Sequence, residues 1–231
     1  MRAGPLPGWA KQTWIILRKD LSIELATKEI VTTSGFFAIL VATIASLAFT
    51  GGSDVRQRVA PGVIWVAVAF AAVLALSRAW QRERDDGALN GLLVSPVARS
   101  AIFAGKALGL SVFLLVIEAI VIPVTALYFG IDLLEVGPGL VVFCLLVTPG
   151  LAASGTLFGA MTVRTRARDL VLAAVMFPLL TPTLLAGVAG TRELFYGATT
   201  AEVSDYFQLI GVFDALFVIG GLGMFELLIE G

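Results

Sequence analysis

Long stretches without a charged residue constrain this chain more than any other feature. Four of them cover residues 30–53, 59–77, 136–163 and 170–191. A helix needs about 20 apolar residues to cross the hydrocarbon core of a bilayer. Residues 101–128 and 206–228 are similarly apolar, although each contains two charged residues. We therefore predict six spanning helices, because a helix satisfies its own backbone hydrogen bonds within lipid.

The composition leads to the same protein class. Apolar residues make up 58% of the chain and charged residues 14%, whereas soluble domains have about 45–50% and about 25%. The sequence predicts an all-α, polytopic membrane protein, with residues 1–231 forming one transmembrane domain. No cleavable signal peptide is expected, because the first apolar stretch begins only near residue 30. The six spans are expected at about 30–50, 59–78, 100–128, 137–161, 170–190 and 206–228.

The basic residues predict how the chain is oriented. Thirteen of the 16 lysines and arginines lie before the first span, between spans two and three (counted through Lys106), or between spans four and five. Only Arg56, Arg58 and Arg192 lie in the alternate loops. Because basic loops stay on the cytoplasmic side, we expect both termini and residues 79–99 in the cytoplasm. The expected location is the inner (plasma) membrane.

Residues 1–28 are predicted to contain an amphipathic helix ahead of the first span. Trp14, Leu17, Leu21 and Leu25 share one helical face, and most basic residues lie elsewhere. Such helices typically lie in the plane of the membrane interface. Two interpretations are equally open: an elbow helix that couples a partner's motion to the first span, or a passive anchor.

The sequence argues against catalysis by this chain. It has no phosphate-binding loop, no G-x-S-x-G nucleophile motif and no histidine, and histidine is the usual general base and metal ligand. The single cysteine, Cys144, lies in an apolar stretch and cannot form a disulfide within the chain. We predict a non-catalytic subunit that binds no metal and no cofactor of its own, and no nucleic acid.

Two carboxylates, Glu118 and Asp214, lie inside predicted spans. An acidic group at mid-membrane is costly, so it usually faces a bundle interior, a cavity or a partner. Each could line a substrate path or be a hydrogen-bonded structural group. Lys106 is expected to snorkel toward the cytoplasmic interface.

Small residues and prolines predict how the spans pack. Gly105 with Gly109, and Gly155 with Gly159, are spaced for close helix contact. They would serve packing within one bundle or, less often, a dimer interface. Pro178 and Pro182 predict a kink or a break in the fifth span.

The loop at residues 79–99 is a charged segment between two spans that also carries exposed apolar residues. Leu89, Leu92 and Leu93 lie at helical spacing, and Asp85 or Asp86 could cap a short helix that starts near Gly87. Leucines that face water predict a docking site for a partner. The alternative is a tight connecting loop that rests on the membrane surface.

This segment carries a family resemblance. Residues 83–96 (ERDDGALNGLLVSP) resemble the E-x-G-T-L-E-x-L-L-x-S-P type segment of ABC-2 exporter permeases. Residues 58–65 (RVAPGVIW), which enter the second span, are closer to the CcmB family, haem exporter protein B of cytochrome c maturation. The resemblance covers essentially the whole chain, and departs from the loop pattern at Ala88 and Asn90.

The resemblance implies an ABC-2-type permease fold and a coupling helix that inserts into a separate ATPase subunit. The implied contact residues are Glu83, Asp85, Asp86, Gly87, Leu89, Asn90, Leu92, Leu93, Ser95 and Pro96. The implied partners are a CcmA-like ATPase, CcmC-like and CcmD-like membrane subunits, a CcmE-like haem chaperone, membrane lipid and possibly a second copy of the chain. The complex would export haem or use ATP to release the loaded chaperone.

Other functions stay open from the sequence. A generic ABC-2 exporter of lipid, drug or polysaccharide would have the same architecture. A non-transporting assembly scaffold, or a proton-coupled carrier that uses Glu118 and Asp214, would differ in mechanism.

Overall fold

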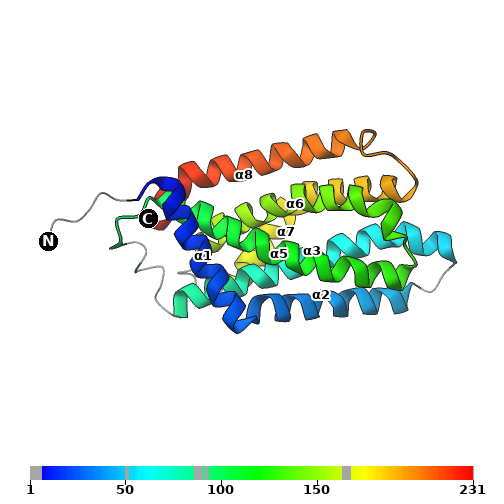
Figure 1. The fold of residues 1–231 in the computed structure, drawn as a ribbon, viewed down its shortest axis with the longest axis horizontal. Coiled ribbons are helices and arrows are strands. Elements are labelled where there is room, and N and C mark those ends of the chain that lie inside the picture. Colours follow the sequence, from blue (N-terminus) through cyan, green and yellow to red (C-terminus); the bar gives the residue numbers. More distant parts are fainter. Residues whose placement is uncertain (1–6, 50–51, 86–90, 92–93, 163–167, 231) are drawn as a thin grey trace.

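The computed structural model describes residues 7–49, 52–85, 91, 94–162 and 168–230. All of the regular secondary structure in this part is helical (Figure 1). The helices longer than one turn are α1 (Trp9–Thr27), α2 (Glu29–Ala48), α3 (Ser53–Asp85), α5 (Arg99–Phe129), α6 (Leu133–Thr162), α7 (Arg168–Phe195) and α8 (Ser204–Glu230).

Six helices are long and apolar enough to cross a membrane, as the sequence predicts. These candidate spans are Glu29–Ala48, Val55–Glu83, Arg99–Phe129, Leu133–Met161, Ala174–Phe195 and Ser204–Glu226. They form one bundle, and both chain termini lie at the same end of it (Figure 1). We call this the terminal end, and the opposite end, where α2, α5 and α7 finish, the far end.

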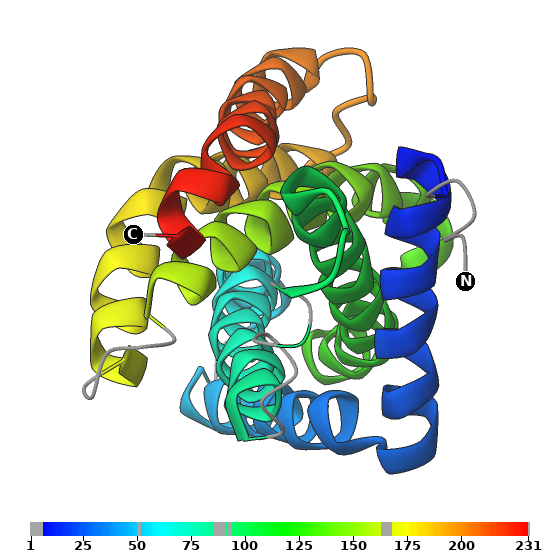
Figure 2. The same ribbon diagram turned by 90° about the vertical axis from the view of Figure 1, so that its left-hand side faces the viewer.

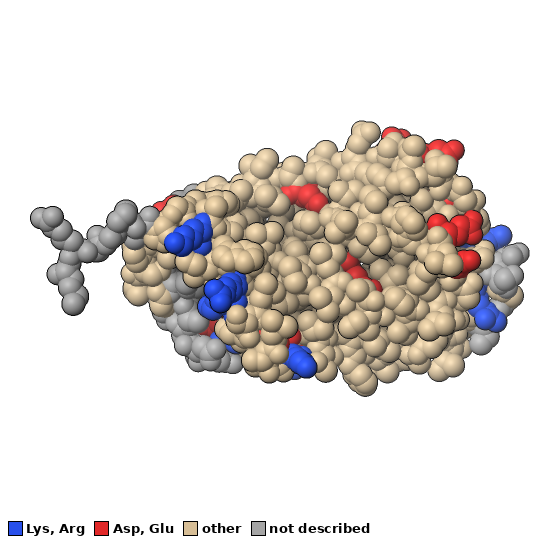
Figure 3. All heavy atoms as spheres, viewed as in Figure 1, with Lys and Arg blue, Asp and Glu red and all other residues tan. Residues whose placement is uncertain are grey.

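The spans differ in how much of their surface the bundle covers. The central helices α3 and α6 are mostly buried, whereas α2 and α8 lie at the periphery (Figure 2). The main core contains Trp65, Leu76, Leu114 and Phe143 from α3, α5 and α6. On the face drawn in Figure 3, charged groups lie mainly toward the two ends, and most of the surface between them carries no charged residue, as expected for a bundle whose outer solvent is lipid.

The first helix, α1, lies across the terminal end rather than along the bundle (Figure 2). It turns into α2 at Lys28, whose backbone is left-handed with φ 53°. The helix packs along α5, where the backbone of Gly105 lies directly beneath Thr13 and Ile16. A methyl group at Gly105 would lie 2.9 Å from the Thr13 carbonyl oxygen, which is too close without a backbone shift.

The buried face of α1 differs from the predicted apolar stripe. Leu17 is buried and Leu21 partly buried, but Trp14 and Leu25 are 60% and 75% exposed. The buried face instead contains several polar residues, namely Gln12, Thr13 and Glu24. Each of these polar groups has a partner: Thr13 donates to the Trp9 carbonyl of its own helix, Gln12 accepts from Ala98 at the start of α5, and Glu24 pairs with Arg82 of α3. The exposed part of the stripe is left for lipid.

Two further packing expectations can be compared with the structure. Gly155 lies against Leu76 and Gly159 against Trp80, so this pair serves packing within one bundle. Pro178 and Pro182 do not break the fifth span, because α7 continues without interruption through both; the alternative that was predicted, a kink, stays a prediction. Membrane helices tolerate proline in this way when nearby groups satisfy the backbone.

We expect Gly105→Ala to destabilise the docking of α1, because the added methyl group would separate α1 from α5. Overpacking of this kind costs about 1–3 kcal/mol. The free energy of unfolding in detergent and the rate of protease cleavage within α1 would measure the effect. Gly220→Ala is the matched control, since a methyl group there meets nothing within 4 Å. Equal stability of the two variants would contradict close α1–α5 packing.

Candidate coupling interface

A buried ion cluster joins α1, α3 and α5 at the terminal end. The Glu83 carboxylate lies 2.7 Å from Lys19 Nζ and 2.7 Å from Lys106 Nζ. Asp20 completes the cluster, 3.1 Å from Lys19 and 3.3 Å from Lys106. The cluster therefore contains two cations and two anions from three different helices, and its formal charge is zero.

Each charge in this cluster is stabilised mainly by its partners. Desolvation alone would lower the pKa of Lys19, but the neighbouring charges of Asp20 and Glu83 outweigh it and raise the pKa above the ordinary value. Lys19 therefore stays charged at neutral pH, and its contribution to stability is lost only as the pH rises through that raised pKa. Removing one member of a buried pair is costly because it leaves the other charge uncompensated.

Lys106 does not snorkel to the membrane interface as expected. Its side chain is only 6% exposed, and its ammonium lies 5.5 Å from the ring centroid of Trp80. Because α1 lies across this part of α5, the shortest route for the Lys106 side chain to water is closed. The ammonium is stabilised by Glu83 and Asp20 instead.

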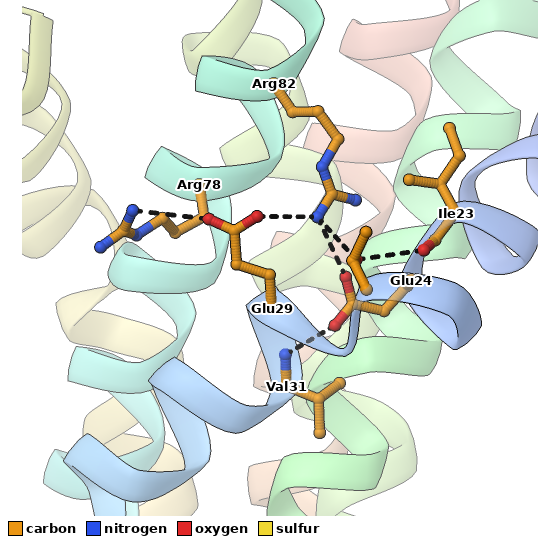
Figure 4. A network of polar contacts seen from close by, with 7 residues as sticks. Ile23, Glu24, Glu29, Val31, Arg78 and Arg82 are labelled. Carbon is orange, nitrogen blue, oxygen red and sulfur yellow. Dashed lines mark hydrogen bonds and ion pairs between the residues drawn. The ribbon is translucent and has the colours of Figure 1, made fainter.

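A second polar group ties α3 to the corner between α1 and α2 (Figure 4). Arg82 reaches Glu24 at 3.5 Å, Glu29 at 3.4 Å and the Thr27 hydroxyl at 3.1 Å. The Glu24 carboxylate also accepts a hydrogen bond of 2.9 Å from the backbone N–H of Val31 in the first turn of α2. One arginine of α3 is thereby connected to both sides of the corner.

The N-terminal half of α1 is bound to the start of α5. The Gln12 side chain accepts a hydrogen bond from the backbone N–H of Ala98 at 2.8 Å, and Trp9 Nε1 donates to Ser100 Oγ at 3.0 Å. Ala98 is the N-cap of α5. The two flanks of residues 86–97 are therefore both attached to α1, at Glu83 and Arg82 before the segment and at Ala98 and Ser100 after it. We call this arrangement the α1 clasp.

Most of the predicted docking residues lie outside the described part of the chain. These are Asp86, Gly87, Leu89, Asn90, Leu92 and Leu93. Gly91 and Val94 are helical, and Val94 is 87% exposed. Ser95 is half-buried and Pro96 exposed.

One of the predicted docking residues needs correction. Asp85 is the last residue of α3, and its role as the cap of a helix near Gly87 stays a prediction, because residues 86–90 lie outside the described part of the chain. Glu83 was expected at the docking surface, but its side chain is buried in the ion cluster. Pairing with Lys19 and Lys106 draws it inward, and it therefore belongs to the α1 clasp.

The two intramembrane carboxyl groups contact α6 from two different helices. Glu118 of α5 accepts a hydrogen bond of 2.8 Å from the Thr148 hydroxyl of α6. Asp214 of α8 lies against the backbone of α6 at Gly150. Among the described residues, one oxygen of each carboxyl group, Glu118 Oε2 and Asp214 Oδ1, has no hydrogen-bond partner. The described residues also contain no cluster of metal-ligating side chains.

Of the clasp residues, only Glu83 was predicted as a contact residue; the others, among them Gln12, Lys19, Asp20, Glu24 and Arg82, were missed. Asp20 and Glu24 are four residues apart and therefore share a helical face. This spacing could have predicted ion pairs, because two acidic residues on one helical face lie at an end of the protein that is rich in lysine and arginine.

Comparison with known proteins gives one consistent family. The CcmB protein family model matches residues 11–222. A heme exporter protein B from Paracoccus denitrificans is 30% identical over 165 residues, which cover 70% of this chain and 74% of that protein. One from Pseudomonas aeruginosa is 30% identical over 162 residues, 70% of this chain and 72% of the relative. One from Bradyrhizobium diazoefficiens is 28% identical over 185 residues, with shares of 79% and 82%.

We expect Lys106→Met to lower the free energy of unfolding by about 3 kcal/mol, the lower end of the cost of breaking a buried ion pair. The double variant Lys106→Met with Glu83→Leu should recover part of this loss, because it removes the excess negative charge and leaves the neutral Lys19–Asp20 pair. Equilibrium unfolding in mixed micelles would measure all three proteins. Lys11→Met, at an exposed position of α1, should change stability by less than about 0.5 kcal/mol. Similar values for Lys106→Met and Lys11→Met would contradict a stabilising cluster.

Proposed function

This chain belongs to the CcmB family, and we propose that it is the membrane permease subunit of a haem-export complex of cytochrome c maturation. In this proposal, ATP is hydrolysed on a separate CcmA-like subunit that docks on residues 86–97. The α1 clasp then transmits the motion of that segment to α1, α2 and α5. Export of haem and ATP-driven release of a haem-loaded chaperone remain the two possible outputs.

The observation that carries this proposal is the attachment of α1 to both flanks of the docking segment. Glu83 and Arg82 lie two to three residues before Asp85, where α3 ends. Ala98 and Ser100 lie at the start of α5. A displacement of residues 86–97 would therefore pull on α1 through an ion cluster on one side and hydrogen bonds on the other. This geometry favours the elbow interpretation of α1 over a passive anchor.

The corner between α1 and α2 extends the connection to the first span. Arg82 contacts Glu24 and Glu29 on the two sides of that corner, and Glu24 also caps α2 through Val31. Helices that move as rigid bodies about a short hinge are a common mode of conformational switching. In the proposal Lys28, whose backbone is left-handed, is the hinge.

Family membership separates the remaining alternatives. It favours haem export and cytochrome c maturation over a generic exporter of lipid, drug or polysaccharide. A proton-coupled carrier gains no support, because Glu118 and Asp214 contact different neighbours on α6. The chain has no histidine, so we propose that CcmC-like, CcmD-like and CcmE-like partners supply any axial ligands for haem.

The basic residues support an orientation in the inner membrane with the terminal end in the cytoplasm. Their concentration on the loops of that end follows the usual rule for cytoplasmic loops. In this orientation residues 86–97 are on the side where ATP is available. The far end, with the turn at residues 130–132, would face the opposite compartment.

Leu92→Asp combined with Leu93→Asp should abolish co-purification of the ATPase subunit while the chain still inserts into the membrane. Two carboxylates in an apolar docking site would have to be buried without partners, which is strongly unfavourable. Affinity purification in mild detergent followed by quantitative mass spectrometry would measure the bound ATPase. Tyr196→Asp is the control, since Tyr196 is exposed at the far end. Retained ATPase in the double variant would contradict docking at this segment.

Arg82→Ala should leave the ATPase bound but reduce the yield of mature cytochrome c in cells. Loss of a typical coupling free energy of about 1–3 kcal/mol corresponds to a change of roughly 5- to 150-fold. Co-purification and haem staining of cytochrome c would be measured on the same strains. Arg192→Ala, at an exposed position near the far end, should affect neither. A normal yield with Arg82→Ala would show that the clasp does not transmit motion.

A further inference from the structure

A lateral groove lies between α5 and α6 in the half of the bundle nearer the far end. Its volume is about 500 Å³, and its walls are almost entirely apolar. It is lined by Leu115, Glu118, Ala119, Ile122, Pro123, Leu133, Leu134, Gly137, Pro138, Leu140, Val141, Cys144 and Leu145. Leu134, Val141 and Leu145 are exposed on the outer surface of the bundle, so the groove opens toward the surrounding lipid.

One polar group, the carboxyl of Glu118, lines this groove together with the Cys144 thiol. The Glu118 side chain is only 2% exposed. Its Oε1 accepts a hydrogen bond from Thr148, whereas Oε2 has no partner with hydrogen-bond geometry among the described residues. Cys144 lies close enough to interact with the carboxyl group, but a thiol is a weak donor. The groove therefore contains an unsatisfied polar atom in an apolar surrounding.

This combination is typical of binding sites for small molecules. Such sites measure about 300–1,000 Å³ and are mostly apolar, with a few polar groups that orient the ligand. A buried polar atom without a partner is unfavourable, because it has lost its hydrogen bonds to water. A ligand that supplies the missing hydrogen bond would recover that free energy. The groove should therefore prefer a ligand with a hydrogen-bonding group over an ordinary lipid chain.

We propose that the α5–α6 groove binds a bilayer-resident amphiphile whose long apolar body carries a hydroxyl group that hydrogen-bonds to Glu118. The apolar body would lie along Leu134, Val141 and Leu145, and the hydroxyl would reach Oε2. Glu118 lies 11 residues before the end of α5 at Phe129, roughly 17 Å along the helix axis. The ligand would therefore enter sideways from the bilayer. The residues that line this site belong neither to the α1 clasp nor to the docking segment.

The residues that line the groove favour a flexible chain over a transmembrane helix of a partner as its occupant. Close helix docking uses small residues along the contact, whereas these walls are mostly leucine, isoleucine and valine. Among the described residues that line the groove, Glu118 alone is charged, and it is buried. A partner helix is nevertheless a distinguishable outcome of the test below.

A second groove on the same bundle provides an internal control. It lies between α3 and α7, has a volume of about 220 Å³, and is lined by apolar residues with Thr181 but no carboxyl group. Both grooves contact lipid, but only the α5–α6 groove contains an acidic oxygen without a partner. Ligands that depend on hydrogen bonding should therefore distinguish the two grooves.

The test uses a hexadecanol derivative with a photoreactive diazirine, and the matched hexadecane derivative without the hydroxyl. The full chain is reconstituted in nanodiscs, both alone and in its co-purified complex, and labelled peptides are identified by mass spectrometry. We expect the alcohol to label residues 115–123 and 133–145 roughly five- to tenfold more than the alkane, the ratio expected for one net hydrogen bond. The α3–α7 groove should be labelled equally by both.

Two variants separate the hydrogen bond from the shape of the groove. Glu118→Leu should remove the preference for the alcohol, while Glu118→Gln should keep part of it because an amide can still hydrogen-bond. Gly137→Leu should fill the groove and reduce labelling by both probes, since a side chain there has open space. The thermal unfolding of each variant in detergent reports whether the fold is retained.

Three outcomes would overturn the proposal. Equal labelling by alcohol and alkane would mean that the groove holds ordinary lipid chains only. An unchanged preference in Glu118→Leu would place the ligand elsewhere. Labelling of the isolated chain that disappears in the complex would show that a partner's helix occupies the groove.

Discussion

The contact of Glu83 with Lys106 and Lys19 is the interaction on which the terminal end of this bundle depends. Charges buried among apolar helices are stable only when they are paired. Here each partner comes from a different helix, α3, α5 or α1. The cluster can therefore exist only when α1 lies across α5, and the position of α1 in turn brings Glu24 and Gln12 to their partners at Arg82 and Ala98. One electrostatic constraint thus organises both flanks of the docking segment.

Close backbone approach allows this arrangement. Gly105 and Gly109 lie under α1, and the missing side chain at Gly105 lets Thr13 and Ile16 approach the backbone of α5. The same device recurs deeper in the bundle, where Gly155 and Gly159 receive Leu76 and Trp80 of α3. In a membrane, helix association depends on such packing and on polar contacts, because lipid offers apolar surface of its own. Glycines and ion pairs therefore act together at the terminal end.

The architecture of the bundle could be predicted from the sequence because the length and apolarity of a span follow directly from bilayer thickness. The details of α1 could not. Its apolar stripe could be predicted from the sequence, but Trp14 and Leu25 face outward. Gln12 and Glu24 are buried instead, because α5 and α3 supply hydrogen-bond and ion-pair partners for them. Lys106 illustrates the same limit. A lysine near the end of a span reaches water unless another element covers it, and the covering helix, α1, lies more than 80 residues earlier in the chain.

The helix α5 connects the coupling interface with the lateral groove. Lys106 belongs to the ion cluster and Glu118 to the groove, and 12 residues of continuous helix separate them, roughly 18 Å. A helix transmits a shift or rotation at one end to its whole length when it moves as a rigid body. A rotation of α5 at Lys106 would therefore also change the width of the groove at Glu118. Because coupling between two sites is reciprocal, an amphiphile that fits only one width would in turn bias the position of α1 and the docking segment.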